Sequence, residues 1–379
     1  MKHVTEFNKK NETVRQRALT SEEAFLLSTQ SHPGGAVWMV LDKEFDVAEK
    51  IIFLERLAKK IAETKSTPDF FMQMERGIAE IRWEAEQQIC NRLIDLLRTP
   101  GYQMEVFILR YRLHPLSDMF LRLLLEYNMF GFDENVLFVN DREENYRQSI
   151  YIKRYCSQLN QVVKKFLMQA SCREGGKLSK NFTRGAYKNY KSLMGFLENI
   201  FSFKSRILVL RVDFLYRDKF GVEEFGGNKV YEKVNLHRKD LIDAIRAHYK
   251  DGIIGYAWKL EYGLRRGYHY HMLFFFDGAK HQSDVSIGMH IGRMWVNVTD
   301  YSGTFHNCNA YKHQYSICGI GMLKHDAPDL EARFDVVASY LTKADHHCRL
   351  ILPGKQRSFQ TSFLKRREGK KGRPRRAKH

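Results

Sequence analysis

The chain lacks the cysteine patterns of a disulfide framework or a structural zinc cluster. Its 379 residues include six cysteines, and no two of them form a Cys-x-x-Cys pair. The six are Cys90, Cys156, Cys172, Cys308, Cys318 and Cys348. Scattered single thiols are typical of a reducing compartment. We therefore expect a cytoplasmic protein with reduced thiols.

Long apolar runs are also missing. No stretch approaches the roughly 18 apolar residues that a transmembrane helix requires, and Met1–Glu6 lacks the apolar core of a signal peptide. The Gly-x-x-x-x-Gly-Lys-Ser/Thr signature of helicase motors is absent as well. We expect no membrane partner, and any strand unwinding must come from another protein.

Acidic residues are outnumbered by basic ones. The chain has 62 Lys and Arg against 44 Asp and Glu, a formal net charge of +18. This excess favours a polyanionic partner, and of the two candidates, nucleic acid and a membrane surface, we expect nucleic acid. From Arg366 onward the sequence is a basic, low-complexity tail, which predicts a disordered segment over residues 361–379 that binds phosphates or aids solubility.

The first half of the chain has the apolar spacing of helices. We expect helices over residues 44–64, from Thr67-Pro68-Asp69 to about Leu97, and over 115–130 and 144–171. Arg173–Lys177 has the composition of a linker. This predicts a mostly helical N-terminal region, residues 1–175, followed by a linker and helix over 176–204.

The second half alternates strands with helices. Strand-like runs are Arg206–Tyr216, Ile253–Tyr262, Tyr268–Phe276 and Ala310–Leu323, and helical patterns are Leu236–Tyr249, Asp284–Val298 and Leu330–Lys343. The short turn between Tyr262 and Tyr268 predicts an antiparallel hairpin. We expect an α+β fold over residues 205–360, an antiparallel sheet with flanking helices and one face free for a ligand.

Two histidines lie in the second strand of this hairpin. His269 and His271 project from the same face because side chains alternate along a strand. Two imidazoles so spaced can bind one metal ion. With 15 histidines in the chain, chance alone supplies roughly 0.6 His-x-His matches, so the motif needs partners.

A carboxylate is the first candidate partner. Glu261 ends the preceding strand and would lie beside the start of the next one. Two histidines and a carboxylate suit a catalytic Mn²⁺ or Mg²⁺ better than a closed zinc site. The alternative is a solvated Glu261 paired with Arg265 or Arg266, and four further histidines could replace it as ligand: His281, His290, His306 and His313.

A tyrosine is the second candidate partner. The spacing Tyr-x-x-Lys occurs at Tyr216, Tyr256 and Tyr340, but only Tyr340 and Lys343 fall in a helical pattern, where positions i and i+3 share a face. Tyr340 is thus the candidate nucleophile, and Lys343 can stabilise the phenolate or the charge on the reacting phosphate. The alternative is a helix tyrosine packed at the edge of a core.

In their order, these motifs resemble the HUH endonucleases, the rolling-circle replication initiators and relaxases. The resemblance rests on the apolar strand Ile207–Asp213, on Glu261 with His269-Tyr270-His271, and on Tyr340-Leu341-Thr342-Lys343. It covers roughly residues 200–360 and is nearest to prophage and filamentous-phage (inovirus) initiators with a single catalytic tyrosine. Tyr270 fills a position where smaller aliphatic residues are also common.

The resemblance implies a divalent-metal-dependent enzyme that nicks and rejoins single-stranded DNA. Tyr340 would attack a phosphodiester at a single-stranded or cruciform origin, giving a 5′-phosphotyrosine and a free 3′-OH that primes replication. The metal would be held by His269, His271 and Glu261. A relaxase or a single-tyrosine transposase would share this chemistry.

The basic residues near the sheet are candidates for DNA contacts. Arg211, Lys259, Arg265 and Arg266 either face DNA or form a plain basic surface. Two alternatives to an enzyme are a non-catalytic basic DNA-binding regulator and, ranked below it, an RNA-binding module. The N-terminal region could recognise duplex DNA, dimerise or recruit a host helicase, and no motif in it chooses among these roles.

Overall fold

The structure is a computed structural model of the whole chain. It describes residues 43–63, 69–75, 78–83, 86–132, 142–171, 173–217, 228–263, 267–342, 345, 347–354 and 356–364. The basic tail from Arg366 lies outside these residues.

The N-terminal half is mostly helical, as the apolar spacing predicted. Leu54, Leu97, Phe120 and Phe166 are among the side chains buried in its core. The helices are α3 (Lys43–Glu63), α4 (Gln87–Leu97), α5 (Gly101–Arg110), α6 (Pro115–Glu126) and α7 (Arg142–Ala170).

The single long helix expected from Pro68 to Leu97 is wrong. The segment forms an antiparallel hairpin of β1 (Phe71–Glu75) and β2 (Ile78–Arg82), and α4 follows it. The spacing of Ile78 and Ile81 fits a helix, but the two strands pair and pack against α7, where Ile81 is buried. Tertiary packing overrides the local pattern here.

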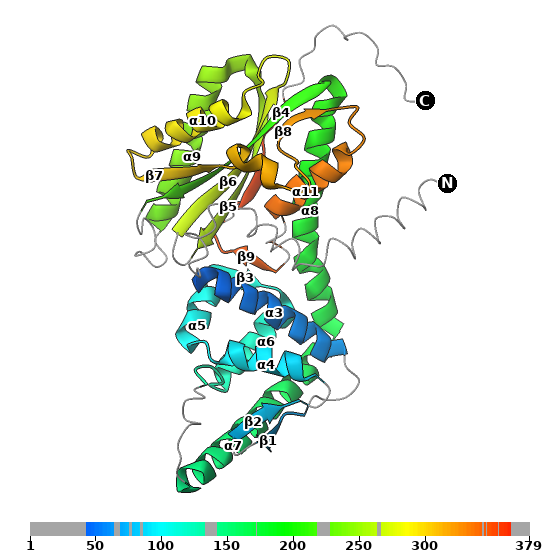
Figure 1. Cartoon of the computed structure of the whole chain (residues 1–379), viewed down its shortest axis with the longest axis vertical. Helices are drawn as coiled ribbons and strands as arrows, with labels where there is room; N and C mark the ends of the chain where they lie inside the picture. The colour runs from blue at the N-terminus through cyan, green and yellow to red at the C-terminus, as the bar shows by residue number, and fades with distance from the viewer. Residues whose placement is uncertain are drawn as a thin grey trace, which may run out of the picture.

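The expected linker over Arg173–Lys177 is also helical. Helix α8 runs without interruption from Arg173 to Phe203. Gly175 and Gly176 fall in its first turn, where a glycine interrupts little of the hydrogen-bond ladder. Helix α8 contacts α6 and α7 at one end and the C-terminal sheet at the other, so it connects the two halves (Figure 1).

The C-terminal half contains a six-stranded antiparallel sheet. Its order is β10-β5-β6-β4-β7, with β8 pairing with another part of β4. The strands are β4 (Arg206–Tyr216), β5 (Ile253–Gly263), β6 (Gly267–Asp277), β7 (Gly303–Asn307), β8 (Gly321–Lys324) and β10 (Phe359–Thr361). The strand expected over Ala310–Leu323 is instead a 3₁₀ segment, Cys308–Gln314, followed by β8.

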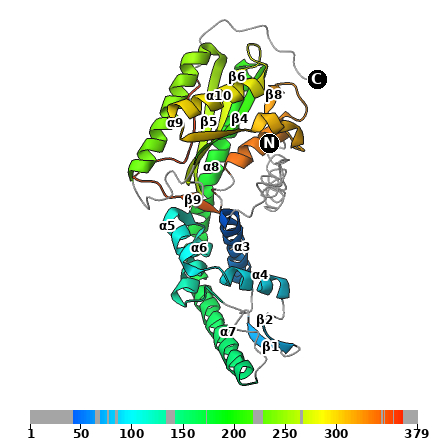
Figure 2. The same ribbon diagram turned by 60° about the vertical axis from the view of Figure 1, so that its left-hand side comes forward.

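Helices cover both faces of this sheet (Figures 1 and 2). Helices α9 (Asn228–Tyr249) and α10 (Asp284–Val298) pack on one face over side chains such as Leu208 and Phe274. Helices α8 and α11 (Leu330–Thr342) pack on the other over Val209 and Phe275. The α+β fold is confirmed. The expectation of a free sheet face is wrong, because β4 to β6 carry apolar side chains on both faces and helices cover both.

A short strand pair joins the two halves. Strand β3 (Tyr111–Leu113) pairs with β9 (Cys348–Leu350), which lies a few residues beyond α11. Tyr111 also donates its hydroxyl to the carbonyl of Tyr262, at the end of β5. The N-terminal half therefore contacts both the hairpin and the chain that follows α11.

Within the described part of the chain, no helix is both long enough and apolar enough to cross a membrane.

Candidate metal centre and adjacent tyrosine

The sheet face under α11 changes from apolar to polar along its strands. On β4, Ile207 and Val209 are buried under α8 and α11, and Arg211 and Asp213 continue the same face. The same face becomes polar toward the end of β5, at Lys259 and Glu261, and near the start of β6, at His269 and His271. The polar side chains gather where the helical cover ends, so they share one partly buried site.

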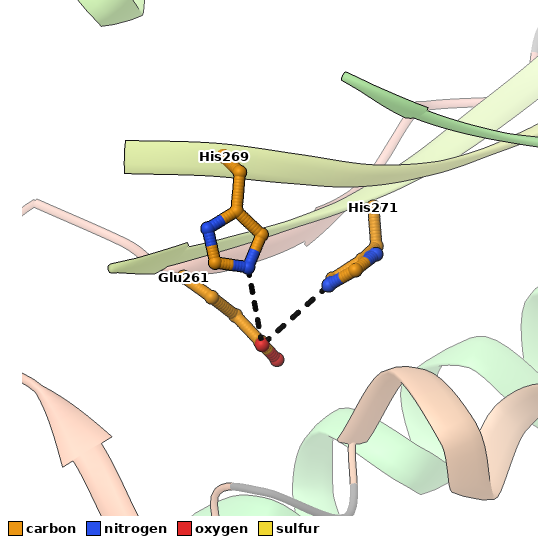
Figure 3. A group of neighbouring side chains, drawn as sticks. All are labelled: Glu261, His269 and His271. Carbon is orange, nitrogen blue, oxygen red and sulfur yellow. Dashed lines mark ion pairs between the residues drawn. The ribbon is translucent and has the colours of Figure 1, made fainter. Parts of the chain in front are cut away.

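Glu261, His269 and His271 form the centre of this site. Glu261 on β5 lies directly opposite His269 on β6, and one ligand atom from each of the three residues lies within 4.8 Å of the others. The Oε2 atom of Glu261 is 3.7 Å from Nε2 of His269 and 3.5 Å from Nε2 of His271. Figure 3 shows the carboxylate pointing between the two imidazole rings.

The neighbouring strand orients His271. Asp213 on β4 is paired with His271 in register, and its carboxylate lies 2.9 Å from Nδ1. A carboxylate at one ring nitrogen directs the other nitrogen toward the ligand position. Burial alone would lower the pKa of His271, but Asp213 and Glu261 raise it to about 9. The site therefore favours a positive charge.

These three residues could hold a divalent cation. Ligand atoms bound to one ion at about 2.1 Å lie roughly 3 to 3.5 Å apart, close to the separations observed here. The side chains are 29%, 11% and 15% exposed for Glu261, His269 and His271, so the site is partly open to solvent. Of the residues that the structure describes, no other three offer such a cluster, and the alternative ligands His281, His290, His306 and His313 are not part of it.

Tyr340 lies next to this cluster. It projects from the last turn of α11, and its ring meets that of His271 edge-on with 5.9 Å between centroids. The guanidinium of Arg211 lies 3.5 Å from the centre of the tyrosine ring. Burial raises the pKa of Tyr340, and Arg211 opposes that shift. A phenol, a guanidinium and a cluster of potential metal ligands are thus brought together.

Arg211 is held within the sheet by Asp213. Two guanidinium nitrogens donate to the two carboxylate oxygens, at 2.8 and 3.1 Å. The Arg211 side chain is only 11% exposed. Its position against Tyr340 differs from the open surface position expected of a simple DNA contact.

The expectation that Lys259 faces DNA is wrong, because this side chain is buried. Its side chain is 2% exposed and forms an ion pair with Asp345. Asn189 on α8 donates to the other oxygen of Asp345 at 3.1 Å. The pair connects β5, the strand that also carries Glu261, to the chain that follows α11. Lys259 therefore supports the site from inside the protein.

Three expected site residues lie outside the described residues. They are Lys343, Arg265 and Arg266. Among the described residues, Arg211 is a cation beside Tyr340, and the sequence had left it as either a DNA contact or part of a basic surface.

The sequence patterns did not assign the contacts of Asp345, and they left Asp213, at the end of the apolar strand Ile207–Asp213, either lining the site or facing water. A signal existed for Asp213, because Arg211 and Asp213 interrupt one face of an otherwise apolar strand at a spacing of two. No comparable pattern identifies Asp345, whose partner lies 86 residues away in the chain.

Comparison with known proteins gives a family and no relatives with a described activity. No curated protein matches the chain, and no solved structure does. A family model matches residues 168–362, which is 195 of the 379 residues and includes α8, the sheet and the cluster. The chain therefore belongs to the YagK/YfjJ C-terminal domain family.

Proposed function

We propose that this protein nicks and rejoins single-stranded DNA with Tyr340 as nucleophile, as an initiator of rolling-circle replication. The observation that carries the proposal is the edge-on contact of Tyr340 with His271, one of three clustered potential metal ligands. The described residues of the three motifs that resemble HUH endonucleases belong to β4, β5 and β6 of one sheet and to α11, which packs against it.

In the proposed reaction, the Tyr340 hydroxyl oxygen attacks the phosphorus of a DNA phosphodiester. The bond from phosphorus to the 3′-oxygen breaks, the phenol proton ends on that oxygen, and the 5′-phosphate stays on Tyr340. The reverse reaction with a 3′-OH rejoins the strand, because the phosphotyrosine conserves the energy of the bond.

The residues around Tyr340 have distinct parts in this scheme. Arg211 stabilises negative charge on the phenolate and on the phosphate in the transition state. His269, His271 and Glu261 would hold Mn²⁺ or Mg²⁺, which supplies charge stabilisation at the scissile phosphate. Asp213 keeps Nε2 of His271 directed at the cluster.

A covalent-capture experiment tests the proposal whatever the sequence of the nick site. Purified protein is incubated with a random-sequence, single-stranded DNA library and Mn²⁺ or Mg²⁺, then denatured, and the DNA that remains attached is sequenced. We expect adducts that require the metal and enrich one sequence. Tyr340→Phe, which removes only the hydroxyl, should abolish them.

Two control variants test whether the adduct depends on the metal cluster and on Tyr340 specifically. His271→Ala should also abolish the adduct, whereas Tyr102→Phe, a change at an exposed tyrosine of α5, should leave it intact. An adduct that persists in Tyr340→Phe would exclude Tyr340 as nucleophile. The captured sequence, placed in its genome, separates replication initiation from transfer or transposition.

A further inference from the structure

Helix α8 carries a basic stripe on its outer face. The stripe consists of Lys177, Lys180, Arg184, Lys188 and Lys191, and the spacings of three and four residues place all five on one side of the helix. All five side chains are exposed. The opposite side of α8 is buried in the protein. At 1.5 Å per residue, the stripe is about 21 Å long.

Nothing among the described residues neutralises the middle of this stripe. No carboxylate of the described chain forms an ion pair with Lys180, Arg184 or Lys188, and the sequence from Lys177 to Leu197 contains no Asp or Glu. Five like charges on one helix repel each other, which is a cost to the folded protein. A polyanion would relieve that repulsion.

An exposed tyrosine stacked on a half-buried one lies beside the stripe. Tyr187 is 38% exposed and stacks on Tyr190, with 6.4 Å between ring centroids. The ammonium of Lys191 lies 4.8 Å from the centre of the Tyr187 ring. An exposed aromatic ring beside a row of cations is typical of surfaces that bind single-stranded nucleic acid, because every base can stack on a ring.

The same helix supports the candidate site. The hydroxyl of Tyr190 donates to Asp335 of α11 at 2.6 Å, and Asn189 donates to Asp345 beyond α11. The stripe therefore lies on the outer side of the helix against which the Tyr340 helix packs. A strand bound along the stripe would lie on the side of α8 away from α11, and its Tyr187 end would lie near the Tyr190–Asp335 contact with α11.

We infer that the α8 stripe binds the phosphate backbone of single-stranded DNA, with Tyr187 as a base-stacking side chain. This inference rests on the proposed function for the choice of DNA as the nucleic acid. It places backbone contacts outside the reaction site on an exposed helix, whereas the side chain of Lys259 is buried. Phosphates pair with the five cations along the strand.

A charge-matched comparison tests the stripe. The α8 variant carries Lys180→Gln, Arg184→Gln and Lys188→Gln, and the control carries Lys153→Gln, Arg154→Gln and Lys164→Gln on α7, where the cations are also exposed. Both sets remove three charges and keep good helix formers. Tyr340→Phe is present throughout, so that binding is measured without cleavage.

Binding is measured by fluorescence anisotropy with a labelled oligo-dT of about 30 nucleotides over a range of salt concentrations. We expect at least about tenfold weaker binding for the α8 variant, and a slope of log Kd against log salt smaller by about 2, since each lost phosphate contact removes about 0.7. The α7 control should keep the parent slope. Tyr187→Ala should weaken binding without changing the slope.

Several results would overturn the inference. They are parent-like binding by the α8 variant, an equal loss in both variants, and a loss seen only with duplex DNA. Circular dichroism confirms that both variants keep their helix content. The adduct assay with Tyr340 intact separates the two proposals: α8-dependent binding without an adduct rejects the nicking function alone, and an adduct with α8-independent binding rejects the stripe alone.

Discussion

At the scale of single residues, the buried Lys259–Asp345 pair is the clearest departure from a surface role for the basic side chains. Lys259 and Asp345 are 2% and 4% exposed. Removing one partner of a buried pair leaves the other charge without compensation, which typically costs about 3–5 kcal/mol. Replacing both partners by apolar residues can be nearly neutral.

Lys259→Met should therefore lower the free energy of unfolding by about 3–5 kcal/mol, measured by urea denaturation. The double variant Lys259→Met/Asp345→Leu should recover much of this loss. If the single variant and the double variant are equally unstable, the uncompensated charge of Asp345 is not the cause. Lys229→Met, at an exposed position of α9, is the control and should change little.

Asp213 lies behind His271 and should affect metal binding without being a ligand. We expect Asp213→Asn to weaken Mn²⁺ binding about 10–100-fold, as is typical for a group that orients a ligating histidine. Isothermal titration calorimetry measures the change. Asp240→Asn, at an exposed site on α9, should bind like the parent. An unchanged Kd in Asp213→Asn would show that His271 needs no orienting partner.

At the scale of elements, the junction between the two halves is built around α3, β3 and β9. Glu55 of α3 is 4% exposed and pairs with Nδ1 of His347 at 2.9 Å, just before β9. His114, after β3, is buried and contacts the Ser179 hydroxyl of α8 at 2.8 Å. Burial lowers the pKa of His114 to about 4, so this ring is neutral at pH 7.

The pairing of Glu55 should make the junction sensitive to acid. Burial would raise the pKa of Glu55, but His347 and Lys59 lower it from 4.5 to about 2. A carboxyl whose folded pKa is below its unfolded pKa stabilises the protein above pH 4.5, and the stabilisation is lost as pH falls toward 2. A shift of this size corresponds to about 3 kcal/mol.

Urea denaturation between about pH 7 and pH 2 tests this expectation. Glu55→Gln should be less stable than the parent at pH 7, and the difference should shrink as the pH falls below 4.5. Glu63→Gln, at an exposed position at the end of the same helix, is the control and should follow the parent. A difference between the parent and Glu55→Gln that stays constant with pH would contradict the assignment.

For some elements, the local sequence pattern was enough to predict the bounds. Strand β4 and helix α10 have the bounds that the sequence predicted, because a strand of 11 residues and a helix of 15 residues carry a strong apolar pattern. The predictions for the β1–β2 hairpin and the 3₁₀ segment at Cys308 were wrong, because their short apolar patterns fit more than one element. The three-residue strands β3, β9 and β10 depend on partners far away in the chain.

At the scale of the whole molecule, the composition sets the net charge, and the fold sets which charged side chains are exposed. The net charge of +18 is a property of composition, and it favours a polyanionic partner whatever the fold. The fold then decides which cations are exposed. It buries Lys259, packs Arg211 against Tyr340, and leaves the α8 stripe on the surface.

The sequence by itself determined the α+β class, the β5–β6 hairpin and the shared face of His269 and His271. These follow from side-chain alternation and short turns, which act over a few residues. Only the tertiary structure decided that Asp213, Arg211 and Asp345 surround the cluster and Tyr340. Those contacts join residues tens of positions apart, and strand pairing and helix packing, which no local pattern encodes, bring them together.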